Sequence, residues 1–413
     1  MTRVLHKAGD ILTSILRGLA GFFTPQRLKM VGGGIAYGVV SYVKDTYKTM
    51  WTICITTSVF GLLMVYSATH SFNNQALGRR QLIMQCLACF LGYVGAIILS
   101  TLDYENLGEI WFVVGGICLF LLLLTFIVGS KATDNADDQS WLRFGSFSFQ
   151  PAELAKIGLM ITLPFHLSKV ERAGKLNSLP HLLLVALHAF VPVGIIELQG
   201  DSGNAIIFLL AFIILMVCSG VKWYYLLAGM FALGAMLPIF WQSMHTFQRE
   251  RIRAVYNPRP GDELDILWQQ TMSKVAIGSG GIQGKGFMKG PMTQGQVNPE
   301  AHNDFIFAVI GEELGFIGTT LAILMLLGIM LLTLRIAFLS RDSMGRHVCV
   351  MYFAILASQT ILNIGMCVGV LPVIGITLPF FSAGGSSSMC LYFGIGLVVS
   401  VYMRRNDATL HFT

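Results

Sequence analysis

The sequence predicts an all-α membrane protein with ten transmembrane helices. Of its 413 residues, 54% are hydrophobic and only 12% are charged, about half the charged share of a soluble globular domain. Mean hydropathy is +0.67, and a soluble fold could not cover so much apolar surface with polar groups. Disordered chains are poor in apolar residues, which excludes disorder. The net charge of +6 is not gathered on one basic face, which argues against nucleic-acid binding.

Ten apolar runs approach the ~20 residues that a membrane helix needs. They do not alternate like the strands of a transmembrane barrel, and a helix satisfies its own backbone hydrogen bonds in lipid. The predicted spans are Met50–Ala68, Gln81–Ser100, Trp111–Ser130, Leu154–Leu167, Leu182–Leu198, Ala205–Gly220, Trp223–Met244, Phe316–Leu339, Cys349–Leu371 and Met389–Met403, with residues 306–310 as an alternative earlier start for the eighth.

The distribution of basic residues predicts that both termini are cytoplasmic. With ten spans the two termini share one side, and in this orientation most Lys and Arg residues fall on inner segments. The exception is the long outer loop 245–304, and long loops translocate largely regardless of charge. We therefore expect a membrane domain at 50–403, in the cytoplasmic membrane, followed by a cytoplasmic tail at 404–413.

Residues 1–49 form a cytoplasmic tail ahead of the first span. Apolar residues between Ile11 and Phe23 fall at helical spacing, with Arg17 among them, and Pro25 follows. This pattern is typical of an amphipathic helix at the membrane surface, with a disordered basic tail as the equal alternative. The eight cysteines lie in or beside apolar runs and indicate no disulfide framework.

The outer segment that leads into the fourth span, residues 137–156, contains a candidate ion pair. Pro151 suits the first turn of a helix, Glu153 follows near its positive end, and Lys156 comes one turn later. A charged residue inside a membrane segment is functional by default and usually has a partner, so we expect Lys156 to pair with Glu153. The alternative is a lysine that extends to the membrane surface.

The outer turn 197–204 reads ELQGDSGN and places Glu197 and Asp201 at membrane depth. The two carboxylates are candidates for a polar site. The competing interpretation is that Asp201 caps the next helix, because an Asp before a short turn and an apolar run is typical of an N-cap.

The long outer loop combines arginines with a glycine-rich stretch. Arg249 and Arg251 come first, and SKVAIGSGGIQGKGFMKG follows with Lys274 and Lys285. Glycines let backbone amides approach an anion closely, so this stretch predicts a cradle for a phosphate or pyrophosphate group. It is not a Walker sequence.

Three acidic residues lie at the end of the loop and just beyond it, beside an apolar stretch. Asp304 adjoins FIFAVIG, where desolvation raises the pKa of a carboxyl toward that of a useful base. Glu312 and Glu313 lie two turns further, and buried carboxylates are costly unless they are paired. The alternative for Asp304 is a helix N-cap.

A last outer segment, residues 369–388, reads GVLPVIGITLPFFSAGGSSS. Irregular backbone at membrane depth is tolerated where it lines a cavity or packs on protein. Together the outer segments indicate a polar site that suits an anionic, amphiphilic substrate. They do not separate an enzyme from a transporter.

Six motifs in order then resemble the SEDS family (shape, elongation, division and sporulation), whose members include RodA and FtsW. They are QPAELAK, QGDSGNA, FQRERI, SKVAIGSGGIQGKG, NDFIFAVIGEELGFIG and LPVIGITLPFFSAGGSSS, spread over most of residues 50–403. The stretch NIGMCVGVLPVIG is more similar to the RodA branch, while Thr377 favours the FtsW branch. The resemblance therefore leans toward a role in cell elongation.

The resemblance implies a peptidoglycan glycosyltransferase that polymerises lipid II and releases undecaprenyl pyrophosphate. It assigns the general base to Asp304, and it places Glu153, Lys156 and Asp201 around a central cavity. Further inferred contacts to the pyrophosphate or glycan are Arg249, Arg251, Lys274 and Lys285.

The implied partners are a class B penicillin-binding protein, which is a transpeptidase, and membrane lipid. No ligand spacing specifies a metal, although carboxylates and a pyrophosphate could recruit a divalent cation. The alternatives are a lipid II flippase and a non-catalytic scaffold. A flippase needs polar groups on both leaflets, whereas the inner loops are short and we expect no charged cluster there.

Overall fold

The computed structural model describes residues 46–70, 72, 75–130, 139–144, 147–244 and 246–406. Two compact units, Met1–Lys48 and Thr49–Thr413, make up the chain, and the structural description below concerns the second. The predicted amphipathic helix at residues 11–23 lies outside the described residues, as do residues 407–413 of the predicted tail.

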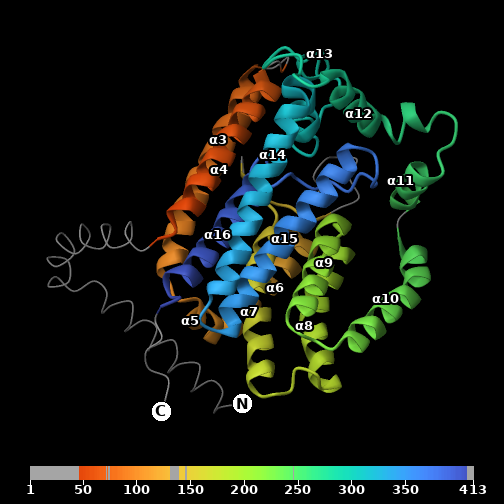
Figure 1. Ribbon diagram of the computed structural model, residues 1–413. Coiled ribbons are helices and arrows are strands. Elements are labelled where there is room, and N and C mark those ends of the chain that lie inside the picture. The colour runs from red at the N-terminus through yellow and green to blue at the C-terminus, as the bar shows by residue number, and fades with distance from the viewer. Residues whose placement is uncertain are drawn as a thin grey trace, which may run out of the picture. The chain divides into compact units, whose positions relative to one another are not determined.

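The described chain is a bundle of helices with a small β-hairpin (Figure 1). The long helices are α3 (Lys48–His70), α4 (Gln75–Thr101), α6 (Trp111–Val128), α7 (Pro151–Arg172), α8 (Leu179–Leu198), α9 (Ser202–Cys218), α10 (Trp223–Ser243), α14 (Ile306–Leu339), α15 (Ser343–Cys367) and α16 (Gly385–Met403). The shorter elements are α5 (Tyr104–Glu109), β1 (Leu142–Phe144), β2 (Phe147–Phe149), α11 (Thr246–Tyr256), η1 (Asp262–Leu264), α12 (Trp268–Gly280) and α13 (Pro291–Gln294).

Each of the ten predicted spans falls on one of the long helices. Seven of these helices, namely α3, α4, α6, α8, α14, α15 and α16, are long and apolar enough to cross a membrane. Helix α9 and the first part of α10 are apolar but shorter. The protein is thus a helical, multi-pass membrane protein, and the number of ten spans stays a prediction.

Helices α15 and α16 form the centre of the bundle. In each of them 78% of the apolar window is buried, against 17% in α6 and α8. Helix α16 packs mainly on α4, and α15 packs on α14, α9 and α7 (Figure 1). Most residues of these two helices are therefore enclosed by other parts of the protein.

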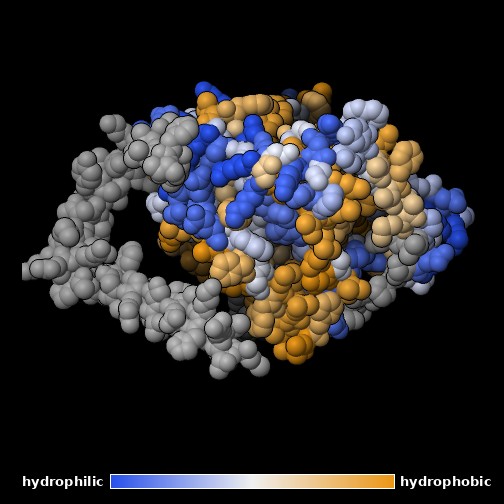
Figure 2. Space-filling model, turned by 90° about the horizontal axis from the view of Figure 1, so that it is seen from below, coloured by the Kyte–Doolittle hydropathy of each residue, from blue (hydrophilic) through white to orange (hydrophobic). Residues whose placement is uncertain are grey.

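The outer surface of the bundle is apolar in the way that lipid requires. Phe90, Phe120 and Leu183 expose more than half of their area, although soluble proteins seldom expose large contiguous apolar patches. Seen from the end where α7 finishes and α8 begins, hydrophilic residues gather on the end face and hydrophobic ones surround them (Figure 2). This distribution fits a bundle whose sides face hydrocarbon.

Acidic caps and prolines begin several helices. The side chains of Asp103, Asp201 and Asp342 accept backbone N–H bonds at the starts of α5, α9 and α15, where they satisfy donors that a helix start leaves free. Pro151 begins α7, as predicted from the tolerance of proline in a first turn.

Several predicted boundaries were wrong, each for a local reason. Helix α14 starts at Ile306 and continues through a non-helical Gly315, so the earlier of the two starts considered is correct. Helix α4 begins at Gln75 because its first polar turns are helical too. The predictions contained no strand, yet β1 and β2 pair antiparallel, with Leu142 opposite Phe149.

The region predicted as a long outer loop contains α11, η1, α12 and α13 in its described part, residues 246–304 (Figure 1). Its glycine-rich turn packs on the break in α14. The N–H groups of Phe316 and Ile317 donate to the carbonyls of Gly281 and Ile282. Gly315 has φ +64° and ψ −156°, a conformation that L side chains rarely adopt. The break in α14 thus lets the loop dock on the helix backbone.

We predict that Gly315→Ala destabilises the protein by about 1–3 kcal/mol or more. The substitution strains the backbone, and its Cβ would come within 2.8 Å of the Gly281 carbonyl oxygen. Gly278→Ala in α12 is the matched control, because a Cβ there meets open space and alanine favours helix by ~1 kcal/mol. Thermal unfolding in detergent measures both, and equal melting temperatures for the two variants would contradict the prediction.

Candidate active site

Asp304 is the last loop residue before α14 and does not cap that helix. Phe305 occupies the N-cap position, and no side-chain hydrogen bond caps the helix there. The alternative of Asp304 as an N-cap is therefore wrong. Within the described part of the chain, no side-chain hydrogen bond of Asp304 is found, and its backbone carbonyl instead accepts a 2.8 Å bond from Asn363.

The Asp304 carboxyl is poised for proton transfer near neutral pH. Its pKa is raised from the ordinary 3.8 to about 7, chiefly by burial and then by the negative charge of Glu300, while the positive charge of Arg251 opposes both effects. Oδ2 faces Gly375, where an added Cβ would lie 3.7 Å away. A carboxyl that has this pKa and accepts no hydrogen bond from the described residues suits the role of a general base.

Arg251 reaches this site from α11. Its Nη1 donates to the Val373 carbonyl at 3.0 Å, and its guanidinium lies 4.3 Å from the centre of the Phe247 ring. Arg251 thus joins α11 to the irregular segment that follows α15, and it supplies positive charge beside Asp304.

The other predicted arginine takes a different place. Arg249 donates from Nε to the Met244 carbonyl at 3.0 Å and from Nη2 to the Gln242 carbonyl at 3.4 Å. These bonds hold the end of α10. The positive charge of Arg251 thus acts on Asp304, whereas the contacts of Arg249 lie at the end of α10.

Glu153 and Lys156 form the predicted ion pair. Lys156 Nζ lies 2.8 Å from Glu153 Oε1, and the two side chains expose only 6% and 4% of their area. The alternative of a lysine extended to the membrane surface is therefore wrong. Among the described residues the second oxygen, Glu153 Oε2, is buried without a hydrogen bond, so the pair is not fully satisfied by the protein.

Asp201 caps α9, as the competing interpretation held. Its Oδ1 accepts the N–H of Asn204 at 3.1 Å, and its Oδ2 accepts Gln150 Nε2 at 2.6 Å. Asp201 therefore ties the start of α7 to the start of α9. It lies on the same side of the bundle as the Glu153 pair, because Gln150 directly precedes α7.

A second chain of polar contacts runs beside this cap. Ser202 Oγ donates to Glu197 Oε1 at 2.9 Å, and Gln248 Nε2 donates to Ser202 Oγ at 3.0 Å. The contacts connect the end of α8 to α11. Glu197 is thus positioned by the same helix ends that hold Asp201.

Backbone N–H groups of the glycine-rich stretch donate to acceptors that belong to α14 of the protein itself. The N–H groups of Lys285 and Gly286 donate to the backbone carbonyls of Glu312 and Glu313. The N–H of Met288 donates to the Glu313 carboxylate at 3.1 Å. These amides therefore bond to acceptors within the fold, and a phosphate cradle formed by the rest of the stretch stays a prediction.

The two glutamates are completely buried and have polar partners instead of cations. Glu312 accepts bonds from the N–H groups of Met292 and Thr293 at 2.7 and 2.8 Å and from the Thr293 hydroxyl. Glu313 accepts from the Ser67 hydroxyl at 2.7 Å. Such hydrogen bonds compensate the burial of carboxylates that would otherwise be costly.

The predicted lysines lie on the surface of the loop. Lys285 is exposed. Lys274 is exposed on α12 and covers Gly369, where an added Cβ would come within 2.8 Å of its Cδ. Lys274 thus lies beside the segment that follows α15, whereas Lys285 lies at the glycine-rich turn.

The irregular segment 368–384 ends earlier than predicted, because α16 begins at Gly385 and includes the serine run. A buried polar network anchors the segment. Thr377 Oγ1 lies 3.1 Å from Ser387 Oγ, and Gln85 Nε2 donates to the Ser382 carbonyl at 3.0 Å and to Ser388 Oγ at 2.9 Å. The network fixes this backbone against α4 and α16.

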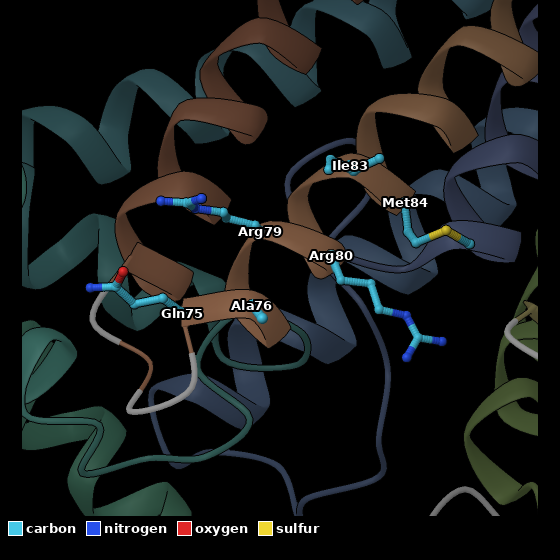
Figure 3. A pocket seen from close by; sticks show the side chains of 6 residues that line it. All are labelled: Gln75, Ala76, Arg79, Arg80, Ile83 and Met84. Carbon is cyan, nitrogen blue, oxygen red and sulfur yellow. The ribbon is translucent and has the colours of Figure 1, made fainter.

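The first turns of α4 carry a surface groove that sequence reasoning missed (Figure 3). It is lined by Gln75, Ala76, Arg79, Arg80, Ile83 and Met84 and encloses about 420 Å³. Two arginines precede an apolar stripe, so the groove is amphiphilic. The available signal was the pair RRQ directly before an apolar run.

The charged residues at the opposite end of the bundle gather into a cluster of ion pairs, which we did not expect there. Arg341 lies 3.1 Å from Glu105, Arg404 lies 3.4 Å from Asp103, and Tyr104 Oη donates to Asp342 at 2.7 Å. The expectation failed because these residues are far apart in sequence and meet only where helix ends converge. They pair with one another and so join α5, α15 and α16.

No group of three or more His, Cys, Asp or Glu residues that could hold a metal ion occurs in the part of the chain that the structure describes. A divalent cation recruited by a substrate would therefore take part of its ligands from that substrate.

The fold and the site define a multi-pass membrane protein with a polar site near one end of its apolar helices. The site contains the Asp304 carboxyl, Arg251 and the buried pair of Glu153 and Lys156. The family model for FtsW, RodA and SpoVE, described as cell cycle proteins, matches residues 47–407. The chain belongs to this family.

Two curated relatives and two solved structures show the extent of the likeness. The chain is 30% identical to peptidoglycan glycosyltransferase MrdB of Escherichia coli K12 over 86% of its length and 93% of the relative's. It is 33% identical to a probable peptidoglycan glycosyltransferase FtsW of Geobacter sulfurreducens over 86% and 95%.

Among solved structures, a chain of a peptidoglycan synthase complex that coordinates polymerization and crosslinking matches with TM-score 0.73 and 27% identity, over 88% of this chain and 99% of that one. The rod shape determining protein RodA of Thermus thermophilus matches with TM-score 0.64 and 25% identity, over 87% and 98%. The likeness thus covers the whole bundle and is not limited to one motif.

Breaking the buried ion pair should destabilise the bundle. Lys156→Met leaves Glu153 charged and unpaired, and removing one partner of a buried pair costs about 3–5 kcal/mol. The double variant Glu153→Gln/Lys156→Met should recover much of this loss, because no charge is left uncompensated. A thermal unfolding cycle in detergent measures the coupling, and additive losses would contradict it.

Asp304→Asn should stabilise the protein, and increasingly so as pH rises. The folded-state pKa of Asp304, about 7, lies above the ordinary value of 3.8, so ionising it in the fold costs stability between roughly pH 4 and pH 7. We expect a larger gain in melting temperature at pH 7.5 than at pH 5. Asp265→Asn, at an exposed loop position, should show no such trend, and a pH-independent gain for Asp304→Asn would refute the assignment.

Proposed function

We propose that the protein is a peptidoglycan glycosyltransferase that polymerises lipid II at the outer face of the cytoplasmic membrane. The observation that carries this proposal is the Asp304 carboxyl, with its pKa of about 7 beside Arg251. The names of the relatives MrdB and FtsW support the reaction class.

The reaction needs one base and one site of positive charge. The acceptor hydroxyl of one lipid II attacks the anomeric carbon of the donor sugar, and its proton passes to the Asp304 carboxylate. A C–O bond forms, and the anomeric C–O bond to pyrophosphate breaks, so undecaprenyl pyrophosphate leaves with the electron pair. Arg251, Lys274 and Lys285 are the proposed stabilisers of this negative charge.

The remaining site residues are proposed substrate contacts of different kinds. Glu153, whose Oε2 has no hydrogen bond within the described chain, offers an acceptor to a sugar hydroxyl or amide, and Lys156 orients it. Asp201 holds the starts of α7 and α9 together beside them. Arg249 acts through the end of α10, which its two bonds hold.

The groove on α4 suits the lipid portion of such a substrate (Figure 3). Arg79 and Arg80 lie at its polar rim, and Ile83 and Met84 continue it along the apolar face of the helix. An anionic headgroup with a hydrocarbon tail matches that order of charge and apolar surface.

Three finer statements belong to the same proposal. Both termini are cytoplasmic, which places Asp304 outside. The partner is a class B penicillin-binding protein, and the matching synthase complex, which coordinates polymerization and crosslinking, supports a partner with transpeptidase activity. The role is cell elongation, supported by the likeness to RodA.

A lipid II flippase is the second candidate, favoured by the charged cluster at the opposite end. That cluster is internally paired. In the described chain, the buried Asp, Glu, Lys and Arg residues are Glu153, Lys156, Glu312 and Glu313, all near the Asp304 end. Within the described residues, no series of buried charged side chains thus leads from this end to the opposite one, which supports the enzyme over the flippase.

Asp304→Ala should abolish polymerisation of labelled lipid II by the purified protein, whether the protein is assayed alone or together with its transpeptidase. Loss of a general base costs at least ~100-fold. Below about pH 7 the wild-type rate should fall roughly tenfold per pH unit, because protonation removes the base.

Asp265→Ala is the matched control, since it removes an exposed carboxylate from the same loop and should retain the wild-type rate. Equal polymer from wild type and Asp304→Ala would exclude the proposed role of Asp304. Transfer of labelled lipid across vesicles without polymer would favour the flippase, and neither activity would favour a scaffold.

A further inference from the structure

Asn363 is a buried amide near the end of α15, and its side-chain nitrogen makes two hydrogen bonds. Nδ2 donates to the Asp304 carbonyl at 2.8 Å and to the Ile376 carbonyl at 2.6 Å. The residue is completely buried. Both protons of the amide are thus used on backbone carbonyls that belong to two different segments.

The first of these carbonyls belongs to the residue that carries the proposed base. At the start of α14 the N–H of Ala308 bonds to the Phe305 carbonyl, and Asn363 supplies the strong donor to the Asp304 carbonyl. Cys367, one turn along α15, adds a weak bond from Sγ at 3.6 Å. Helix α15 therefore holds the Asp304 backbone from one side.

The second carbonyl belongs to the segment that faces the carboxylate. Ile376 follows Gly375, which has φ +66° and whose missing side chain leaves room beside Asp304 Oδ2. One rigid amide on a central helix thus sets the spacing between the backbone that carries the carboxyl and the backbone opposite it.

We propose that Asn363 is a positioning residue for the glycosyl transfer, which acts by holding Asp304 at a fixed distance from the Gly375–Ile376 backbone. The inference rests on the proposed function of Asp304. Its physical basis is that a misplacement of 1 Å in a reacting group can lower a rate by ~100-fold. Removal of the amide also takes this donor from the Ile376 carbonyl and leaves the Asp304 carbonyl with the weak Cys367 bond.

A neighbouring amide provides the matched control. Gln270 of α12 is buried, and its Nε2 donates to the Met366 and Leu371 carbonyls at 2.8 and 2.7 Å. It therefore clamps two carbonyls in the same region as Asn363 does, but neither belongs to Asp304. Loss of Gln270 tests the structural cost of removing such a clamp.

The experiment compares wild type, Asn363→Leu, Asn363→Asp, Gln270→Leu and Asp304→Ala as full-length protein with labelled lipid II from pH 5.5 to 8.5. For Asn363→Leu we expect kcat to fall ~10–100-fold with KM changed less than about threefold. Gln270→Leu should lower the melting temperature while keeping the wild-type pH midpoint.

The isosteric variant Asn363→Asp tests position through the pH profile. The ionisable or charged groups that face Asp304 are Glu300 of the loop, Arg251 of α11 and Cys367 of α15. An additional carboxyl from α15 disfavours ionisation of Asp304 by like charge. The acid limb of the rate should therefore move to higher pH by at least about half a unit.

The outcomes separate the two proposals. An active wild type, an inactive Asp304→Ala and an Asn363→Leu with unchanged kcat would overturn the positioning role alone. If Asn363→Leu does not fold, the acid limb of Asn363→Asp decides: a shifted midpoint supports the role, and an unshifted one overturns it. A wild type without polymerisation overturns the proposed function and this inference with it.

Discussion

The burial of two carboxylates, Glu312 and Glu313, is the interaction on which the site depends. Among the described residues neither has a cationic partner. Glu312 draws its hydrogen bonds from the loop that precedes α14, and Glu313 draws its own from that loop and from Ser67. Because an unsatisfied buried carboxylate is costly, the loop is held on the bundle at those points. The loop ends at Asp304, so the same contacts determine where the proposed base lies.

The environment of Asp304 follows from that arrangement. The loop and the segment after α15 enclose the carboxyl, which raises its pKa, and Arg251 limits the rise. The Asp304 carboxyl therefore lies between these two segments and remains available to accept a proton. Such a carboxyl reduces the stability of the fold and suits proton transfer, a compromise that is common where catalytic groups are concentrated.

Glycines let the backbone of this loop come close either to a bound phosphate or to a neighbouring helix, and composition alone does not distinguish these two roles. The sequence pattern suggested amides that approach a phosphate, whereas the N–H groups with known partners donate to two backbone carbonyls and one carboxylate of α14. The pattern reports close approach and not the identity of the partner. Gly315 and Gly284 allow two backbones to meet there, as their positive φ angles require.

Much of the architecture was predictable from sequence. The apolar runs, the pairing of Lys156 with Glu153 and the cap at Asp201 depend on residues close together in the chain, and local spacing determines them. The start of α14 was less predictable, because Gly315 leaves helical geometry inside a continuous apolar run. The charged cluster of Arg341 was missed, since its partners lie far away in sequence.

What the sequence by itself determined is the membrane bundle, because hydrophobicity and helical period are local properties of a segment. It also identified Asp304 and the family motifs. Only the tertiary structure decided that Arg251 and not Arg249 reaches Asp304, and that Asn363 holds it. Such choices depend on how helix ends converge, and the energy of a buried hydrogen bond depends on a partner that no local pattern specifies.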